Sequence, residues 1–198
     1  MTALKITGLV IALIILSGII MSYTSKRKTE RQAFRLVKEV GEMEIRFYPK
    51  ALMATVKTKS SSYMQQSNNQ FRTLAGYIFG GNQKKEKIAM TAPVHMETDS
   101  AGSSMSFVMP AGYSLNDLPQ PADSLVQLHY SDEGYYAVMK FGGYASDEKI
   151  LKTEQALKQK LSELKLLSSG NFRYLGYNAP WDFIGRENEV LVKIEYSE

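Results

Sequence analysis

The sequence predicts an α+β fold in which two ββαββ repeats build one curved antiparallel sheet or distorted barrel, with a long helix from each repeat packed against it. Three observations predict this class. Short segments of alternating apolar and polar residues recur along the chain. Two longer segments carry apolar residues at spacings of three and four. The order strand-strand-helix-strand-strand occurs twice, and each half alone is too small to bury one face of its sheet.

The first repeat begins with two strands, Met43–Tyr48 and 51–56, which Pro49-Lys50 is expected to join as a hairpin. A helix is expected over residues 62–79, because Phe71, Leu74 and Ile78 recur at helical spacing and Gly80-Gly81-Asn82 follows. Two more strands are expected over residues 88–94 and 105–110. The loop at 115–121 (LNDLPQP) then joins the two repeats.

The second repeat follows the same order. Strands are expected over residues 125–130 and 135–141, on either side of a turn at 132–134. Ser146 is predicted to cap a longer helix that runs to about residue 167. Ser168-Ser169-Gly170 is expected to end this helix, and the closing strands are expected over residues 172–177 and 189–196. The whole folded domain is expected over residues 41–198.

The composition excludes several classes of enzyme. The chain has 198 residues, 44% of them hydrophobic and 22% charged, which is enough apolar material for a core. It contains no cysteine, so disulfides, thiolate metal sites and cysteine nucleophiles are excluded. Its two histidines, His95 and His129, lie too far apart for an HExxH zinc motif.

The net charge of +4 does not indicate a nucleic-acid partner. The first 39 residues hold 7 basic and 2 acidic side chains, which leaves 17 basic and 18 acidic side chains from residue 40 onward. A DNA-binding domain normally carries its positive charge on the fold itself. The folded part of this chain is nearly neutral, so no nucleic-acid partner is expected.

Residues 1–25 are predicted to be an N-terminal transmembrane anchor or signal segment. No charged residue occurs from position 6 to position 25, and about 20 helical residues span the hydrocarbon core of a bilayer. The basic run Lys26-Arg27-Lys28 follows, within a linker expected over residues 26–40. A single-pass membrane anchor is favoured over a cleaved signal peptide, because Ser22-Tyr23-Thr24 fits a cleavage site poorly. The flanking charges leave the side of the membrane open.

Few side chains carry recognisable chemistry. No G-x-S-x-G motif occurs, and neither histidine sits in a known motif, although either could bind iron as a neutral imidazole. Met64, Phe71 and other methionine and aromatic side chains could line an apolar pocket for a flat ligand, or simply form the core. Arg72 or Arg186 could pair with a ligand carboxylate, or lie on the surface.

Several stretches, in order, resemble the SOUL haem-binding protein family. They are spread in the family order across about residues 34–196: Met43–Tyr48 (MEIRFY), 71–82 (FRTLAGYIFGGN), 87–94 (KIAMTAPV), 105–110 (MSFVMP), 118–121 (LPQP), 141–144 (FGGY) and 177–190 (YNAPWDFIGRENEV). The resemblance implies a distorted barrel of eight or nine strands flanked by two long helices. It also implies relatedness to gyrase-inhibitor-like and effector-binding modules.

The same resemblance implies binding of haem or another tetrapyrrole, by a carrier or buffer rather than an enzyme. The porphyrin would lie between the first helix and the last loop, with no catalytic residue and no fixed iron ligand. By position, the site residues are Met64, Asn68, Phe71, Arg72, Ala75, Trp181 and Phe183. Some relatives carry a histidine in the first strand where this chain has Phe47, so the iron would need another ligand, such as a methionine or His129, or none.

Three functions therefore compete. The first is a membrane-tethered binder of haem, another tetrapyrrole or a similar apolar small molecule. The second is a hydrolase that uses the same groove, which requires a carboxylate such as Glu187 or Glu189 to point into it. The third is a non-catalytic interaction module at the membrane surface, since a fold does not dictate a function.

Overall fold

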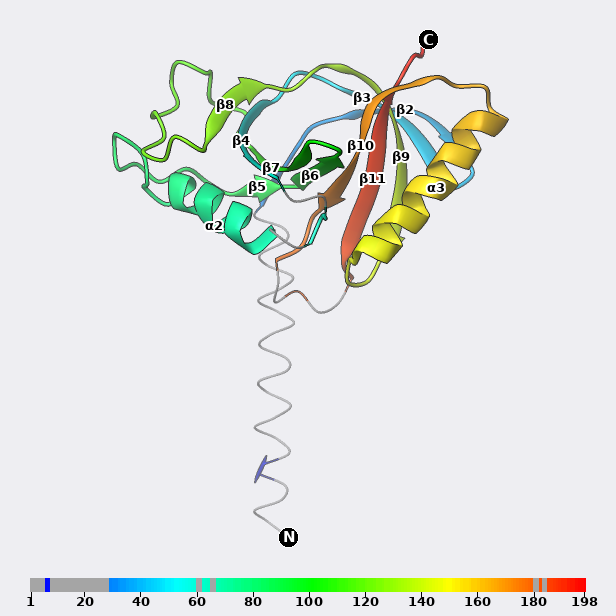
Figure 1. Ribbon diagram of the computed structural model, residues 1–198. Coiled ribbons are helices and arrows are strands. Elements are labelled where there is room, and N and C mark those ends of the chain that lie inside the picture. Colours follow the sequence, from blue (N-terminus) through cyan, green and yellow to red (C-terminus); the bar gives the residue numbers. More distant parts are fainter. Residues whose placement is uncertain (1–5, 8–28, 60–61, 65–66, 180–181, 183–184) are drawn as a thin grey trace.

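The structure, a computed structural model, describes residues 6–7, 29–59, 62–64, 67–179, 182 and 185–198. Within them, a nine-stranded sheet, a separate two-stranded sheet and two helices form the fold (Figure 1). The helices are α2 (Ser67–Ile78) and α3 (Asp147–Glu163). The strands are β1 (Glu30–Arg31), β2 (Arg35–Val40), β3 (Met43–Tyr48), β4 (Leu52–Thr58), β5 (Thr91–Ala92), β6 (Val94–Asp99), β7 (Gly102–Val108), β8 (Gln127–Tyr130), β9 (Gly134–Gly142), β10 (Ser168–Gly176) and β11 (Glu187–Ile194).

The two predicted repeats are present, and they exchange their first strands. The large sheet has the order β2-β3-β9-β11-β10-β6-β7-β4-β8. Counted outward from the boundary between β10 and β6, strands β10, β11 and β9 of the second repeat occupy the same places as β6, β7 and β4 of the first. The first strand of each repeat lies in the other half, because β3 pairs with β9 and β8 pairs with β4. The two halves therefore share one sheet.

This exchange makes the predicted hairpin over residues 43–56 wrong. β3 pairs with β2 and β9, whereas β4 pairs with β7 and β8. Alternation and a turn locate two strands, but they do not identify the partner of each strand. The strand expected over residues 88–94 is also misplaced, since β5 covers only Thr91–Ala92 and β6 continues to residue 99.

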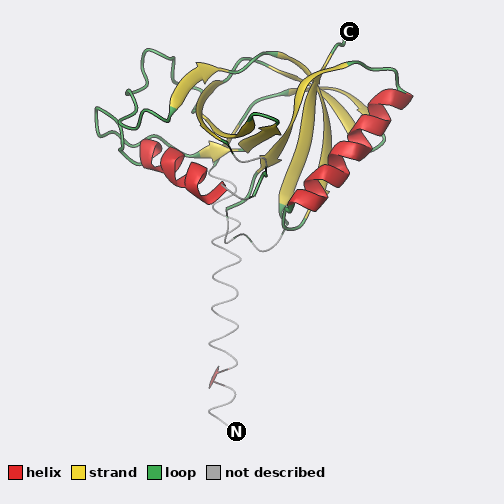
Figure 2. Cartoon of the chain, viewed as in Figure 1, coloured by secondary structure: helices red, strands yellow, loops and turns green. Residues whose placement is uncertain are grey.

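The sheet is curved but open, so the predicted barrel is not closed. Its edges are β2 and β8, and Figure 2 shows the strands curling between these edges. Edge strand β2 carries the charged side chains Arg35, Lys38 and Glu39, a common protection against further pairing. Residues 30–31 and 35–40 were expected to belong to a linker, but they form β1 and β2 and pair with β5 and β3.

Both helices cover the same face of the sheet. Leu74 and Ile78 of α2, and Ile150 and Leu157 of α3, belong to one buried cluster with alternate residues of the strands, such as Ala54. α2 packs on β4 and β7, and α3 packs on β9, β10 and β11. The intervening strand residues therefore point to the opposite face, which neither helix covers.

The predicted cap of the second helix is confirmed at Ser146. Its side chain accepts a hydrogen bond from the backbone N–H of Lys149 at 3.3 Å, and Asp147 and Glu148 occupy the first turn. Carboxylates there interact favourably with the helix dipole. The helix ends at residue 163 rather than 167, and Ser168–Gly176 forms β10.

We expect Ser146→Ala to lower the free energy of unfolding by about 1 kcal/mol, because the first turn loses its side-chain acceptor. Urea unfolding followed by circular dichroism measures this change. Ser162→Ala, on the exposed side of the same helix, is the matched control and should cost nothing, since alanine is the better helix former. Equal stabilities of the two variants would show that the cap contributes nothing.

The prediction of a single-pass membrane anchor is wrong for the part of the chain that the structure describes. No helix within the described ranges is both long enough and apolar enough to cross a bilayer. The anchor was assigned to residues 1–25, of which all but residues 6–7 lie outside the described residues.

Candidate functional site

One face of α2 carries four of the seven residues that the family resemblance indicates. Asn68 and Arg72 lie four residues apart, as do Phe71 and Ala75, and each pair is offset from the other by three, so all four share one side of the helix. Asn68 and Arg72 are exposed, whereas Phe71 and Ala75 are half-buried. Phe79, just after the helix, is 62% exposed and extends this side. We call these five residues the α2 stripe.

Met64 lies just before α2 and is half-buried against the core. The residues beside it bind the other helix: Ser62 Oγ donates to Asp147 at 2.7 Å, and the Tyr63 hydroxyl donates to Glu154 at 2.6 Å. Burial, followed by this hydrogen bond, raises the pKa of Tyr63 above its ordinary value. These contacts hold residues 62–64 on α3, which explains why α2 begins later than predicted.

The last loop contributes the other two predicted residues, Trp181 and Phe183, and both lie outside the described residues. Between them, Asp182 is buried, and its carbonyl accepts a hydrogen bond from Arg186 Nη1 at 2.7 Å. Arg186 therefore binds backbone carbonyls of the last loop. Of the two arginines considered for a ligand carboxylate, Arg72 is the exposed one.

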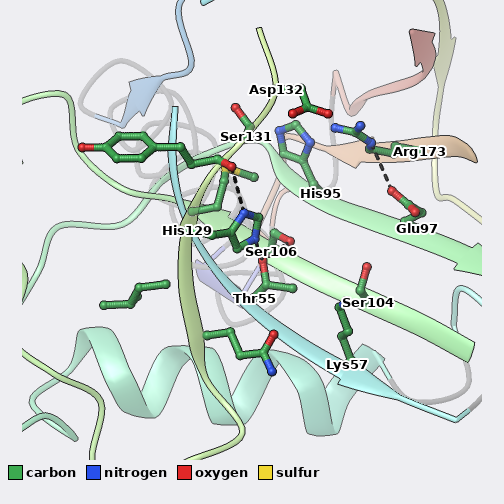
Figure 3. Close-up of a pocket in the computed structure, with 14 residues that line it drawn as sticks. Thr55, Lys57, His95, Glu97, Ser104, Ser106, His129, Ser131, Asp132 and Arg173 are labelled. Atoms are coloured by element: carbon green, nitrogen blue, oxygen red, sulfur yellow. Dashed lines mark hydrogen bonds and ion pairs between the residues drawn. The ribbon is translucent and has the colours of Figure 1, made fainter. Parts of the chain in front are cut away.

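The sheet face opposite the helices holds a second candidate site, which was not foreseen from the sequence. A cavity of about 450 Å³ opens there, lined by β4, β6, β7, β8, β10 and the loop after β8 (Figure 3). The strand register places two polar rows on its floor: His95, Ser106, Thr55 and Gln127, and then Arg173, Glu97, Ser104 and Lys57. We call these eight residues the polar floor.

A directed chain of hydrogen bonds crosses the polar floor. His129 Nδ1 lies 3.0 Å from the carbonyl oxygen of Tyr130, and a carbonyl only accepts, so Nδ1 carries a proton. In the tautomer with the proton on Nδ1, Nε2 accepts from the Thr55 hydroxyl at 2.8 Å. Thr55 Oγ1 in turn accepts from Ser106 Oγ at 2.7 Å. Both ring nitrogens of His129 are therefore engaged within the protein.

His95 is buried and keeps one ring nitrogen unbonded. Its Nε2 donates to Gln32 Oε1 at 2.7 Å, so Nδ1 is the unprotonated nitrogen. Nδ1 has no hydrogen-bond partner among the described residues. Burial, and then the charge of Arg173, lowers the pKa of His95 to about 3. The side chain is thus a neutral acceptor at physiological pH.

Beyond the polar floor, the same face holds a buried arginine. Arg46 is fully buried and donates to both oxygens of Glu189 at 2.8 and 2.9 Å, and to Glu44 at 2.6 Å. Tyr177 donates to Glu189 at 2.7 Å, and the centroid of the Phe34 ring lies 4.1 Å from the guanidinium carbon of Arg46. Burial alone would lower the pKa of Arg46, but the hydrogen bonds and charge of Glu189 raise it.

No pattern in the sequence indicates that this arginine is buried. Glu44 and Arg46 alternate with apolar residues in β3, a pattern that predicts two water-facing side chains. β3 lies inside the sheet between β2 and β9, and Phe34 covers its polar face. The partner of Arg46 is 143 residues away, so only the folded chain shows the pair.

A family model described as SOUL heme-binding protein matches residues 29–193, most of the chain. The chain belongs to the SOUL family. The matched region starts just before β1, and it includes β2 together with both repeats. Membership in the SOUL family agrees with the observed α+β fold of two helices on one large antiparallel sheet.

Heme-binding proteins are among the similar sequences. Heme-binding protein 2 of Mus musculus is 31% identical over 157 residues, which cover 76% of this chain and 77% of that protein. Heme-binding protein 2 of Homo sapiens matches with the same identity and coverage. Heme-binding protein 1 of Xenopus tropicalis is 24% identical over 154 residues, covering 74% of this chain and 80% of that protein.

Solved structures share the fold at low sequence identity. A hydrolase from Listeria innocua superposes with a TM-score of 0.56 at 10% identity, covering 87% of this chain and 97% of that one. The EcmrR C-terminal domain superposes with a TM-score of 0.59 at 10% identity, covering 78% and 98%. At such identities the likeness concerns the fold alone.

Proposed function

We propose that this SOUL protein binds haem or a similar flat tetrapyrrole non-covalently on the α2 stripe, as a carrier or buffer rather than as a catalyst. The observation that carries the proposal is the stripe itself. Phe71 and Phe79 offer aromatic surface, Ala75 between them leaves room for a flat ring, and the exposed Arg72 can pair with a propionate. The names of the similar sequences support the ligand class.

The residues fit the macrocycle and its propionates, but they offer no histidine to the iron. Within the described part of the proposed site, the side chain that could bind the iron is Met64, because a methionine sulfur is an axial ligand in some haem proteins. Phe47 lies on β3, toward the other end of the sheet from β4, and its ring centroid is 5.3 Å from that of Tyr135. His95 and His129 lie on the face opposite α2. Bound haem would supply a redox-active iron and a strong visible absorption.

The carboxylates considered for hydrolysis have other partners. Glu189 is buried, and Arg46 and Tyr177 occupy its two oxygens. Glu187 lies on the surface and pairs with Arg31 at 2.8 Å. A general base must be within reach of a substrate proton, and neither carboxylate lines the cavity on the polar floor. These contacts support binding rather than catalysis.

The test is a titration of the full chain with haemin, followed at the Soret band. We expect a saturable one-to-one shift. Phe71→Asp should weaken binding by about tenfold, which corresponds to about 1.4 kcal/mol, because a carboxylate replaces the aromatic surface and repels the propionates. Arg72→Glu, at an exposed position, should weaken binding without affecting the core.

Leu151→Asp is the matched control, because Leu151 is an exposed apolar residue on the other helix, α3. It should bind haemin as the unmodified chain does. Circular dichroism checks that each variant is folded. Absence of a saturable shift, or equal affinity in Arg72→Glu and Leu151→Asp, would refute the α2 stripe as the site.

A further inference from the structure

The polar floor lies on the opposite side of the sheet from the α2 stripe, so it is a separate feature of the molecule. Thr55, His95 and Ser106 are buried on this face, although buried positions are usually occupied by apolar side chains. Neither helix packs on this face, and a cavity of about 450 Å³ stands above it. This volume falls within the roughly 300–1,000 Å³ of small-molecule pockets.

Two adjacent acceptors on the floor lack a donor. His95 Nδ1 has no hydrogen-bond partner within the described residues, and a buried polar atom without a partner is costly. Ser106 donates its proton to Thr55, so its own oxygen remains an acceptor. His95 and Ser106 are direct cross-strand neighbours on β6 and β7, where Cβ atoms lie about 5 Å apart. Nδ1 itself is buried, so a ligand hydroxyl in the cavity can donate to Ser106 but does not reach His95.

One positively charged side chain on the polar floor, Lys57, has no ion-pair partner among the described residues. Arg173 pairs with Glu97 at 3.1 Å, and Asp132 at the cavity rim lies 3.9 Å from Lys193. Lys57 lines the cavity and lies beside Ser104, two residues along β7 from Ser106, which is roughly 7 Å along the strand. An anionic group on the ligand would meet Lys57.

We propose that this cavity binds a sugar phosphate or a closely similar molecule, in which a hydroxyl group donates to Ser106 and one anionic group faces Lys57. Hydroxyl-rich ligands suit a floor of serine, threonine and glutamine side chains. A ligand ammonium would also donate to Ser106, but Lys57 and Arg173 would repel it. The site is independent of tetrapyrrole binding.

The proposal is tested by saturation-transfer NMR on the full chain, with ribose 5-phosphate and glucose 6-phosphate as probes. Ribose, glucose and inorganic phosphate are the comparators. We expect saturable binding of at least one sugar phosphate, tighter than its parent sugar and tighter than inorganic phosphate. Lys57→Gln should weaken sugar phosphate binding about threefold, as for an exposed ion pair, and leave binding of the parent sugar unchanged. Ser106→Ala should weaken both by about threefold to tenfold.

Lys152→Gln is the matched control, because Lys152 is an exposed lysine on α3, outside the cavity. It should change nothing, and Phe71→Asp should leave sugar phosphate binding intact, which separates this site from the α2 stripe. Failure of both sugar phosphates to bind would overturn the proposal. It would equally be overturned if inorganic phosphate bound as tightly, or if Lys57→Gln and Ser106→Ala both bound like Lys152→Gln.

Discussion

Replacing Arg46 with alanine is expected to lower the free energy of unfolding by about 3–5 kcal/mol, the usual cost of removing one partner of a buried ion pair. Arg46 is fully buried, and its guanidinium contacts Glu189, Glu44 and the Tyr48 hydroxyl. Without it, the buried carboxylate of Glu189 keeps the hydrogen bond from Tyr177 but loses both hydrogen bonds and the ion pair with the guanidinium. The loss should therefore exceed that of an ordinary arginine truncation.

Urea unfolding of the full chain measures this loss, and Arg35→Ala is the matched control. Arg35 lies on the neighbouring strand β2 and pairs with Glu198, but both side chains are about half exposed. Such a surface pair is worth about 0–1 kcal/mol. A double-mutant cycle of Arg46→Met with Glu189→Gln should show coupling between the two residues. If Arg46→Ala cost no more than Arg35→Ala, the buried network would not stabilise the fold.

Local patterns in the sequence predicted elements well because their causes are local. Ser146 followed by Asp147 and Glu148 marks a helix start by its own chemistry, and the structure has the cap there. The ββαββ order likewise follows from alternation and helical spacing. The family resemblance selected residues of α2, and helical spacing places Asn68 and Arg72 on one side of it.

Pairing and burial could not be predicted in the same way, because they depend on distant residues. A hairpin was the simplest partner choice for β3 and β4, yet each repeat gives its first strand to the other half. The polar floor depends on this arrangement, since β8 brings His129 to Thr55 across 74 residues of sequence. The alternation of His129 within its strand was visible, but the cavity beside it was not.

His95 is expected to make the fold sensitive to acid. Its pKa lies at about 3 in the folded chain, against an ordinary value of 6.5, because burial and then Arg173 disfavour the charged ring. Below pH 6.5 the unfolded chain binds a proton that the folded chain does not. The free energy of unfolding therefore falls as the pH drops from 6.5 toward 3, and this contribution is fully present above 6.5. The full loss is about 5 kcal/mol, at about 1.4 kcal/mol for each pH unit.

The chain has two histidines, which makes the measurement direct. In proton NMR, the imidazole resonance of His95 should not shift on titration through neutral pH. Carboxylates with a lowered pKa, such as Glu44, add their own acid sensitivity, so unfolding at several pH values is compared with His95→Gln. That variant should lose part of the slope, whereas His129→Gln should keep it. A His95 resonance that titrates near its ordinary pKa would show that water reaches the ring and that burial does not lower its pKa.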